Sequence, residues 1–372
     1  MKITLLPLVG LLFSAVAPPW LVAVTLHPIA VADSRSDAKA LEIYFIDVEG
    51  GQSTLIVTPA GQSLLVDTGF PGAGTMQSPT GDPRQARDAQ RILAAAHHAG
   101  LKAIDYLLIT HFHPDHDGGV PELAELIPIR TFIDHGSVSP NEEQNVPGTI
   151  AAFDAYTTVR AKGRHIEPKP GDRLPLNGIN AVIVSSAGST IVKPLAGGGA
   201  PNPACDPSAP LPQAGENPRS TGLRLQFGRF RFVDLGDLSG NPLFGLFCPN
   251  DLLGVADLYL LPHHGNADVS DPAMFGAVRP RVAIMNNGAT KGGAPEMFVS
   301  LHRAQGIEDV WQLHRSENEG ALNFADDRIA NLDQSTDYWI KVSAQEDGSF
   351  VVTNARTGAS KMYTVLSGSS RR

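Results

Sequence analysis

The feature that most constrains this chain is a ligand-rich turn directly after a short apolar strand. Residues 104–110, IDYLLIT, form a short continuous apolar run, which is typical of a strand buried on both faces. The segment THFHPDHDGG (110–119) then brings imidazole and carboxylate groups close together, on His111, His113, Asp115 and His116. Such groups are costly to bury unless a metal ion or water satisfies them. The sequence therefore predicts a metal site at the edge of a sheet.

The ligand types indicate which metals this turn can hold. Neutral imidazole and carboxylate are the usual ligands of zinc, manganese and iron. A solvated polar turn is the alternative, and the density of ligand-type side chains argues against it. Gly118 and Gly119 let the backbone leave the turn without steric cost.

Strands and helices are expected to alternate along the rest of the chain. Apolar runs predict strands at 41–48, 53–59, 62–69, 129–134, 181–185, 222–227, 230–235, 257–262, 281–286 and 308–313. Apolar periodicity predicts helices at 84–99, near 121–126 and near 148–161. The pattern favours the α/β class, as one αββα sandwich over 33–335. The alternating tail, 336–372, is expected to form a small β-rich C-terminal extension with antiparallel strands.

The N-terminus has the pattern of a secretory signal. After Lys2 the chain carries no charged side chain before Asp33, and Ala-Val-Ala at 30–32 provides a cleavage site. We expect a signal peptide at 1–32, a secreted or periplasmic protein, and no stable membrane association after cleavage. An uncleaved membrane anchor is the alternative, because the uncharged run is long enough to span a bilayer.

Composition restricts the partners and the redox setting. The 372 residues include 29 Lys and Arg against 38 Asp and Glu, a formal net charge of −9, so there is no general attraction to nucleic acid. The only two cysteines, Cys205 and Cys248, lie in Pro-rich loop sequence and can pair or remain thiols. They have no CxxC spacing, which argues against a cysteine-based zinc site.

The motifs resemble those of one superfamily. HFHPDH (111–116) matches the HxHxDH signature of the metallo-β-lactamase superfamily, and LVDTG (65–69), VDLGD (233–237) and LPHHG (261–265) resemble its other motifs in the same order. Within that superfamily, IDVEGGQSTLI, LGDL and PHHG are most similar to the extracytoplasmic hydrolase domains of competence-type ComEC/Rec2 proteins. The resemblance covers roughly residues 41–315. It implies a metallo-β-lactamase-like hydrolase domain over residues 33–335.

The resemblance implies two divalent metal ions, with zinc as the first expectation and manganese or iron as alternatives. His111 and His113 would hold one ion, and Asp115, His116 and one histidine of the pair His263/His264 would hold the other. Asp237 would bridge the two ions. Motif position favours His263 as the ligand. Asp67 would orient the metal-binding turn by hydrogen bonding.

Catalytic roles follow from the chemistry of a metal-activated water. Asp115 would orient the nucleophile and carry its proton, while His264 or Asn287 would donate to the developing oxyanion. The stretch 182–190 lacks the further histidine that completes the first metal site in many family members. His135, at the end of a predicted strand, is a candidate for that vacancy, and an ordinary core or surface histidine is the alternative.

The expected function is that of an extracytoplasmic metal-dependent hydrolase, which uses a metal-activated water on an ester, a lactone or a related small substrate. A phosphodiesterase or nuclease of the competence-protein type is one alternative. An iron-dependent oxidoreductase on the same fold is another, because His and Asp ligands also accept iron. A small molecule is the expected partner, and nucleic acid is not favoured.

Overall fold

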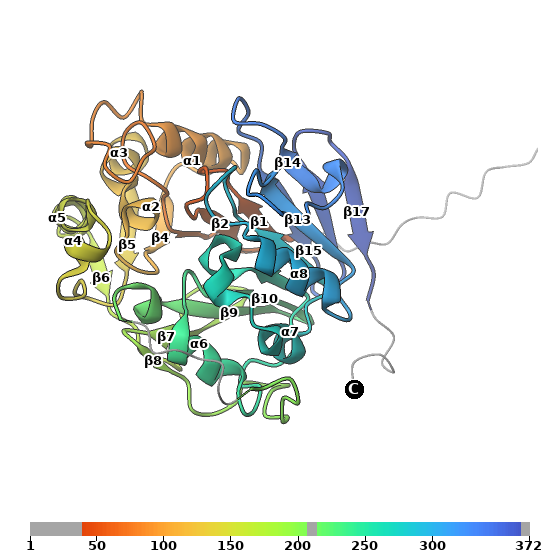
Figure 1. Ribbon diagram of the computed structural model, residues 1–372. Coiled ribbons are helices and arrows are strands. Elements are labelled where there is room, and N and C mark those ends of the chain that lie inside the picture. Colours follow the sequence, from red (N-terminus) through yellow and green to blue (C-terminus); the bar gives the residue numbers. More distant parts are fainter. Residues whose placement is uncertain (1–38, 207–213, 366–372) are drawn as a thin grey trace, which may run out of the picture. The chain divides into compact units, whose positions relative to one another are not determined.

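The computed structural model describes residues 39–206 and 214–365 of the chain (Figure 1). The predicted signal peptide, 1–32, lies outside the described residues. From Lys39 onward the chain forms one compact unit. Within the described ranges, no helix is sufficiently long and apolar to cross a membrane.

The first of two sheets contains nine strands in the order β17-β16-β15-β1-β2-β3-β4-β5-β6. The strands that the sequence predicts in the N-terminal third are confirmed here. The bounds are β1 Leu41–Phe45, β2 Thr54–Val57, β3 Ser63–Val66, β4 Ile104–Leu108, β5 Ile129–Ile133, β6 Arg164–Ile166, β15 Ile340–Ala344, β16 Phe350–Asn354 and β17 Ser360–Tyr363. Strands β3 to β6 run parallel to one another, so their carboxyl ends meet at one edge.

The second sheet contains eight strands in the order β14-β13-β12-β11-β10-β9-β7-β8. The bounds are β7 Asn180–Ser186, β8 Ser189–Thr190, β9 Gly222–Phe227, β10 Phe230–Asp234, β11 Leu258–Leu260, β12 Val282–Met285, β13 Asp309–His314 and β14 Ile329–Asn331. Strands β10 to β14 are parallel neighbours, and the loops that leave β10, β11 and β12 supply functional side chains described below.

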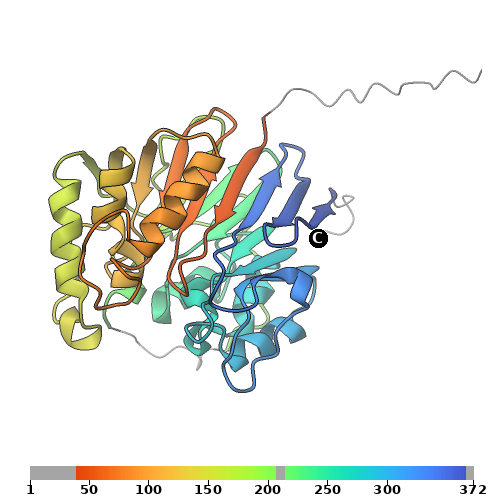
Figure 2. The ribbon, with the colours of Figure 1, turned by 90° about the horizontal axis from the view of Figure 1, so that it is seen from above.

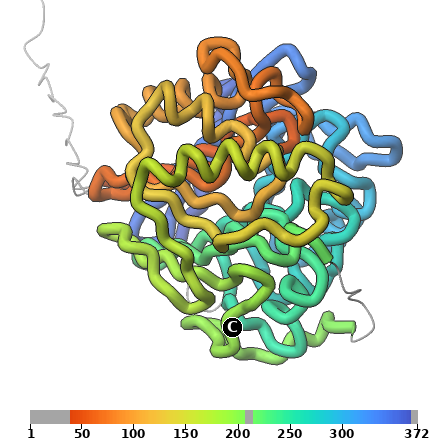
Figure 3. Tube along the Cα trace, turned by 90° about the vertical axis from the view of Figure 1, so that its left-hand side faces the viewer, coloured from red at the N-terminus to blue at the C-terminus, as the bar shows by residue number. Residues whose placement is uncertain are grey.

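Helices cover the outer faces of both sheets, and the predicted helices of the N-terminal half are confirmed. The bounds are α1 Arg87–His98, α2 Pro114–Asp117, α3 Val120–Leu126, α4 Glu142–Asn145, α5 Thr149–Arg160, α6 Gly240–Phe247, α7 Pro272–Val278 and α8 Pro295–Arg303, with short 3-10 segments η1 Asn217–Arg219, η2 Pro262–Gly265, η3 Ala267–Val269 and η4 Asp326–Arg328. Figure 2 shows helices on both sides of the sheets, and Figure 3 shows α5 crossing the face turned to the viewer.

The alternation of side chains along each strand explains this layering. On β3, Leu64 and Val66 enter the core between the sheets, whereas Leu65 packs in the core beneath the helices of the N-terminal half. On β12, Ile284 faces the central core and Ala283 faces the helices of the C-terminal half. Strands such as β3 and β12 therefore bury both faces, and the result is the αββα sandwich that the sequence predicts.

The C-terminal strands extend the first sheet. β15 pairs antiparallel with β1, and β16 and β17 continue outward from it. Phe350 and Tyr363 are buried in the core between the sheets. The antiparallel strands expected within 336–372 are therefore present, but they share the core of the main domain instead of forming a sheet of their own.

The structure pairs the two cysteines. Cys205 and Cys248 form a disulfide that closes a sequence separation of 43 residues. It ties the loop after β8 to the end of α6, and this settles the alternative that the sequence left open.

Candidate metal centre

The metal-binding turn lies where β4 ends. After Leu108 the chain places His111 and His113 in an irregular segment, and His113 precedes the short helix α2, which carries Asp115 and His116. Pro114 at the first helical position fixes a backbone angle that starts the helix. His111, Asp115 and His116 are buried, so strand, turn and helix together aim their side chains into the protein.

The opposite side of the centre comes from the second sheet. Asp237 follows β10, and the η2 segment after β11 carries His263 and His264. Both histidines have left-handed backbones, with φ of 47° and 55°. This conformation is strained for side chains with a Cβ, and strain of this kind concentrates at functional sites.

Four side chains from these segments form one compact cluster: Asp115, His116, Asp237 and His264. One ligand atom from each lies within 4.8 Å of the others. Asp237 Oδ2 is 3.2 Å from His116 Nε2 and 3.2 Å from His264 Nε2, and Asp115 Oδ2 is 3.4 Å from each of these nitrogens. Two imidazoles and two carboxylates converging in this way match the donor preferences of a divalent metal such as zinc.

The buried polar atoms of the cluster show that a metal fits there. Within the described part of the chain, His116 Nε2, His264 Nε2 and Asp237 Oδ1 are buried and have no hydrogen-bond partner. Buried nitrogen and oxygen atoms are rarely left unpaired in native proteins. A metal ion held by these residues would satisfy them.

A second, less complete set of donors adjoins the cluster. His111 Nε2 and His113 Nδ1 lie 2.9 Å apart, and His111 Nε2 is 3.9 Å from Asp237 Oδ2. Asp237 therefore lies between the two sets, as expected for a bridging ligand. His111, His113 and Asp237 are the protein donors that would hold the first predicted ion.

His135 does not join this second set of donors. Its Nε2 donates to Glu216 Oε2 at 3.0 Å, and its Nδ1 lies 3.5 Å from the guanidinium of Arg219. Both ring nitrogens are engaged away from the metal centre, so the ordinary core histidine is the interpretation that the structure supports.

Acidic residues hold the ligand imidazoles in place. His116 Nδ1 donates to Asp67 Oδ2 at 2.7 Å, and the same carboxylate accepts from Thr110 N at 2.7 Å. Asp67 thus orients His116, as the sequence predicts. His113 Nε2 donates to Glu142 Oε1 at 3.1 Å. Hydrogen bonds of this kind fix the ring orientation and raise the basicity of a ligand imidazole.

Charges at the centre shift the pKa values of its members. Burial alone would lower the pKa of His116, but the carboxylates of Asp237, Asp115 and Asp67 raise it well above its ordinary value. Burial and the imidazoles of His116 and His113 hold the pKa of His111 well below its ordinary value. His111 is therefore neutral and free to ligate, whereas a metal that binds His116 must displace a proton.

The carboxylates remain ionised despite their burial. Burial would raise the pKa of Asp237, yet the neighbouring imidazoles, first that of His116, hold it well below its usual range. Burial acts in the same direction on Asp115, and the ammonium of Lys291 is the foremost group that holds its pKa well below that range. Both carboxylates are thus available as anionic ligands.

Lys291 is a member of the centre that the motifs did not indicate. Its Nζ lies 2.5 Å from Asp115 Oδ2 and 2.8 Å from Gly50 O, and about a third of its side chain (34%) remains exposed. It belongs to the loop between β12 and α8. The loop sequence NNGATKGG after a predicted strand was the only signal for it. Glu142, the first residue of α4, and Glu216, just before η1, were also missed, because no motif surrounds either residue.

The structure separates the two histidines of the HHG segment. The sequence predicted that His264 donates to the developing oxyanion. In the structure it is buried within the four-residue cluster that can hold a metal. His263, the predicted ligand, has Nε2 3.7 Å from Asp237 Oδ2, and its Nδ1 donates to Asp268 at 2.9 Å. Both lie near the carboxylate of Asp237, and the choice of His263 as ligand stays a prediction.

Asn287 is not placed to donate to an oxyanion. Its side-chain amide donates to the backbone oxygens of Gly288 and His314, at 2.8 and 2.9 Å. The turn-stabilising role, which was the alternative, therefore accounts for this residue.

Comparison with known proteins finds a family model that matches the part of the chain with the HFHPDH motif. Residues 46–174 match the family model of the metallo-beta-lactamase superfamily. Among curated proteins, none matches the chain significantly. The match and the two-sheet architecture support a metallo-beta-lactamase superfamily domain, and members of this superfamily are mostly metal-dependent hydrolases.

Solved structures with similarity to this chain differ in activity. A metallo-beta-lactamase of Cronobacter sakazakii is 14% identical with a TM-score of 0.30, over 53% of this chain and 60% of its own. CmlA, a diiron beta-hydroxylase from Streptomyces venezuelae, is 14% identical with a TM-score of 0.37, over 74% of this chain and 48% of its own. Zn(2+)-bound PqqB from Methylobacterium extorquens is 13% identical with a TM-score of 0.37, over 71% of this chain and 96% of its own. Similarity at this level does not decide the reaction.

Proposed function

We propose that this chain is an extracytoplasmic metal-dependent hydrolase that acts on an ester, a lactone or a related small substrate. The observation that carries the proposal is the buried cluster of Asp115, His116, Asp237 and His264, whose ligand atoms converge within 4.8 Å. Divalent metal bound there would supply Lewis acidity and lower the pKa of water to near neutrality.

The residues of the chain prepare the site for this chemistry. Asp67 and Glu142 orient the imidazoles of His116 and His113, so that their other nitrogens face the centre. Asp115 and Asp237 remain carboxylates and can orient a water molecule or accept its proton. These fixed groups need no rearrangement when the reaction proceeds.

Lys291 supplies a positive charge at the edge of the centre. Its ammonium contacts Asp115 and is partly exposed, so it can also face a bound substrate. Hydrolysis of an ester or lactone develops negative charge on the carbonyl oxygen. We expect Lys291 to stabilise that charge, since a preorganised cation in a partly dehydrated site is effective there.

Two features support the extracytoplasmic setting. The disulfide between Cys205 and Cys248 is of a kind that persists in oxidising compartments. The uncharged N-terminal segment with its Ala-Val-Ala sequence is typical of a secretory signal.

The net charge of −9 favours a small molecule over a nucleic acid as substrate.

A panel of model substrates tests the proposal. We expect the protein reconstituted with zinc or manganese to hydrolyse p-nitrophenyl acetate or a γ-lactone, and Asp237→Ala to lose at least about a hundredfold in kcat/KM. Asp172→Ala, which changes an exposed carboxylate far from the centre in sequence, is the matched control and should retain full activity.

Three outcomes would contradict this function. Cleavage of bis-p-nitrophenyl phosphate without ester or lactone hydrolysis would favour a phosphodiesterase. Stoichiometric iron with oxygen consumption would favour an oxidoreductase. Ester hydrolysis that survives in Asp237→Ala would show that the cluster is not the active centre.

A further inference from the structure

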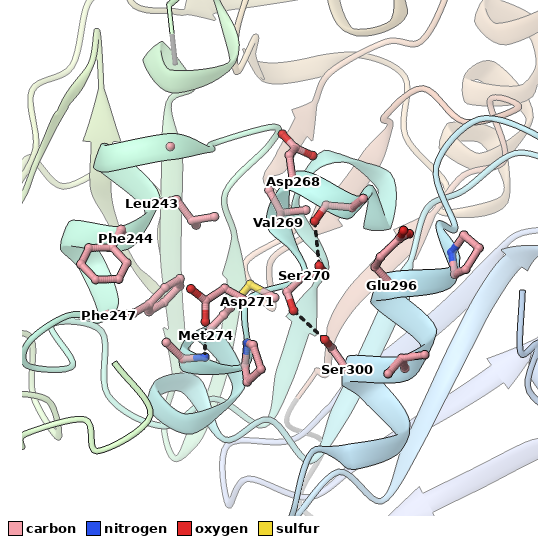
Figure 4. A pocket seen from close by; sticks show the side chains of 16 residues that line it. Leu243, Phe244, Phe247, Asp268, Val269, Ser270, Asp271, Met274, Glu296 and Ser300 are labelled. Atoms are coloured by element: carbon pink, nitrogen blue, oxygen red, sulfur yellow. Dashed lines mark hydrogen bonds between the residues drawn. The ribbon is translucent and has the colours of Figure 1, made fainter. Parts of the chain in front are cut away.

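A cavity of about 750 Å³ lies between helical segments of the C-terminal half of the chain (Figure 4). Its walls are α6, η3 and the start of α7, and α8. Each of three walls follows a loop of the metal centre: α6 begins three residues after Asp237, η3 three residues after His264, and α8 four residues after Lys291. The segments that build the centre therefore also build the cavity.

A single imidazole joins the cavity to the metal cluster. Asp268 lines the cavity, and its carboxylate accepts a hydrogen bond of 2.9 Å from His263 Nδ1. On the opposite side of the same ring, His263 Nε2 lies 3.7 Å from Asp237 Oδ2. A molecule seated in the cavity against Asp268 is thus one side chain away from the bridging carboxylate.

The lining of the cavity is mainly apolar. Leu243, Phe244 and Phe247 enter from α6, Val269 and Met274 come from η3 and α7, and Val299 comes from α8. Figure 4 shows the α6 side chains and Met274 on one side and Ser270, Ser300 and Glu296 on the other. A concave site of this volume with a mainly apolar lining is typical of small-molecule binding sites.

The charged residues in the lining exclude one class of ligand. Three carboxylates line the cavity, on Asp268, Asp271 and Glu296, and the 16 lining residues, all within the described ranges, include no Lys, Arg or His. Asp271 accepts from Ala273 N at the start of α7, so this carboxylate also has a structural role. An anionic group would meet only like charge here, whereas an uncharged apolar group meets no penalty.

We propose that this cavity is the subsite for the uncharged, apolar part of the substrate, an acyl chain or aromatic group whose ester or lactone bond lies at the metal centre. The assignment rests on the proposed hydrolase function. It narrows the substrate class to neutral hydrophobic esters and lactones and excludes substrates with an anionic tail.

Binding of a dye tests the cavity independently of hydrolysis. N-phenyl-1-naphthylamine is apolar and uncharged at neutral pH, and its fluorescence rises when it is bound. Val299→Trp should fill the cavity, because Val299 lines it from α8. Val192→Trp is the matched control, since Val192 is 87% exposed and lies outside the lining. Ala267→Trp, at an exposed lining position, serves if Val299→Trp does not fold.

We expect wild type and Val192→Trp to bind the dye equally, and Val299→Trp or Ala267→Trp to bind it at least about tenfold more weakly. The sulfonated analogue 1-anilinonaphthalene-8-sulfonate should bind wild type at least about tenfold more weakly than the neutral dye. No binding of the neutral dye, equal binding in the cavity variants, or equal binding of the sulfonate would overturn the proposal.

Chain-length preference connects the cavity to the reaction. Octanoate has six more methylenes than acetate, and each one transferred from water gains roughly fourfold at most, so the limit is about 4,000-fold. The ratio of kcat/KM for p-nitrophenyl octanoate to that for the acetate should exceed about 30 in wild type, which requires only partial burial of the chain. The ratio should fall at least about tenfold in Val299→Trp and stay unchanged in Val192→Trp. A ratio that is the same in all three proteins would overturn the proposal.

The two experiments separate this inference from the proposed function. If no ester or lactone is hydrolysed, the hydrolase proposal fails, and dye binding still decides whether the cavity takes neutral apolar ligands. If esters are hydrolysed without dye binding and without chain-length preference, only the subsite is wrong.

Discussion

Replacing Lys291 with methionine should destabilise the metal-free protein far more than the metal-loaded protein. In the metal-free protein the ammonium of Lys291 lies 2.5 Å from Asp115 Oδ2 and compensates a carboxylate that is only 3% exposed. Methionine keeps the apolar stem of the side chain and removes the charge. The buried carboxylate then loses its closest cation and keeps only the imidazoles of His116 and His264, each 3.4 Å away, unless a metal ion compensates its charge.

The size of the effect follows from the exposure of the two partners. Removal of one partner from a fully buried ion pair destabilises a protein by about 3–5 kcal/mol. Lys291 is 34% exposed, and solvent screening reduces the expected loss to about 2 kcal/mol in the metal-free protein. In the metal-loaded protein we expect a loss of about 0.5 kcal/mol, because the metal takes over the compensation. The two losses of unfolding free energy differ by about 1.5 kcal/mol. Lys291→Met must therefore bind the metal about tenfold more tightly than wild type does.

Urea unfolding with a chelator and with saturating zinc measures both losses, and competition with a chromophoric chelator measures the metal affinity. Lys341→Met is the matched control: Lys341 Nζ lies 2.5 Å from Glu42 Oε2 with 28% of the side chain exposed, on a strand that carries no metal ligand. The control should lose the same stability in both states. Equal losses for Lys291→Met in both states, or weaker metal binding, would refute the reasoning.

Three further predictions concern the surroundings of the centre. Asp67→Asn should weaken metal binding by roughly 10- to 100-fold, because the hydrogen bond that orients His116 is weakened, and metal titration checks this. Burial raises the pKa of Asp234 to about 7, so the folded metal-free protein keeps a proton that the unfolded chain releases near pH 4. Stability should therefore fall by roughly 3 kcal/mol between pH 4.5 and 7.5, and urea unfolding should show a smaller fall in Asp234→Asn. The double variant Cys205→Ser with Cys248→Ser should lose up to about 4 kcal/mol for a separation of 43 residues, measured by urea unfolding against wild type with and without reductant.

The local part of the fold and of the site could be predicted from the sequence. Apolar runs and their periodicity located the strands and helices, because each element buries a face that its own residues define. The HFHPDH turn is also local, since one strand end and one short helix position all its side chains. Asp237 could be found because it directly follows a strand that ends beside the turn.

Features that depend on contacts between distant segments could not be predicted. The position of His264 in the cluster depends on the left-handed backbone of the η2 segment, which motif position does not reveal. Lys291 reaches Asp115 across 176 residues of sequence, from a glycine-rich loop without a motif. Pairing of β15 with β1 joins the two ends of the domain, and alternation alone predicts strands without naming their partners.

Metal content tests the central claim most directly. We would measure bound metal by mass spectrometry in wild type, in His264→Ala and in His302→Ala, a control histidine on α8 that lies outside the cluster. The account predicts at least one equivalent of divalent metal in wild type and in His302→Ala, and substantially less in His264→Ala. Absence of metal from wild type after reconstitution, or full occupancy in His264→Ala, would contradict it.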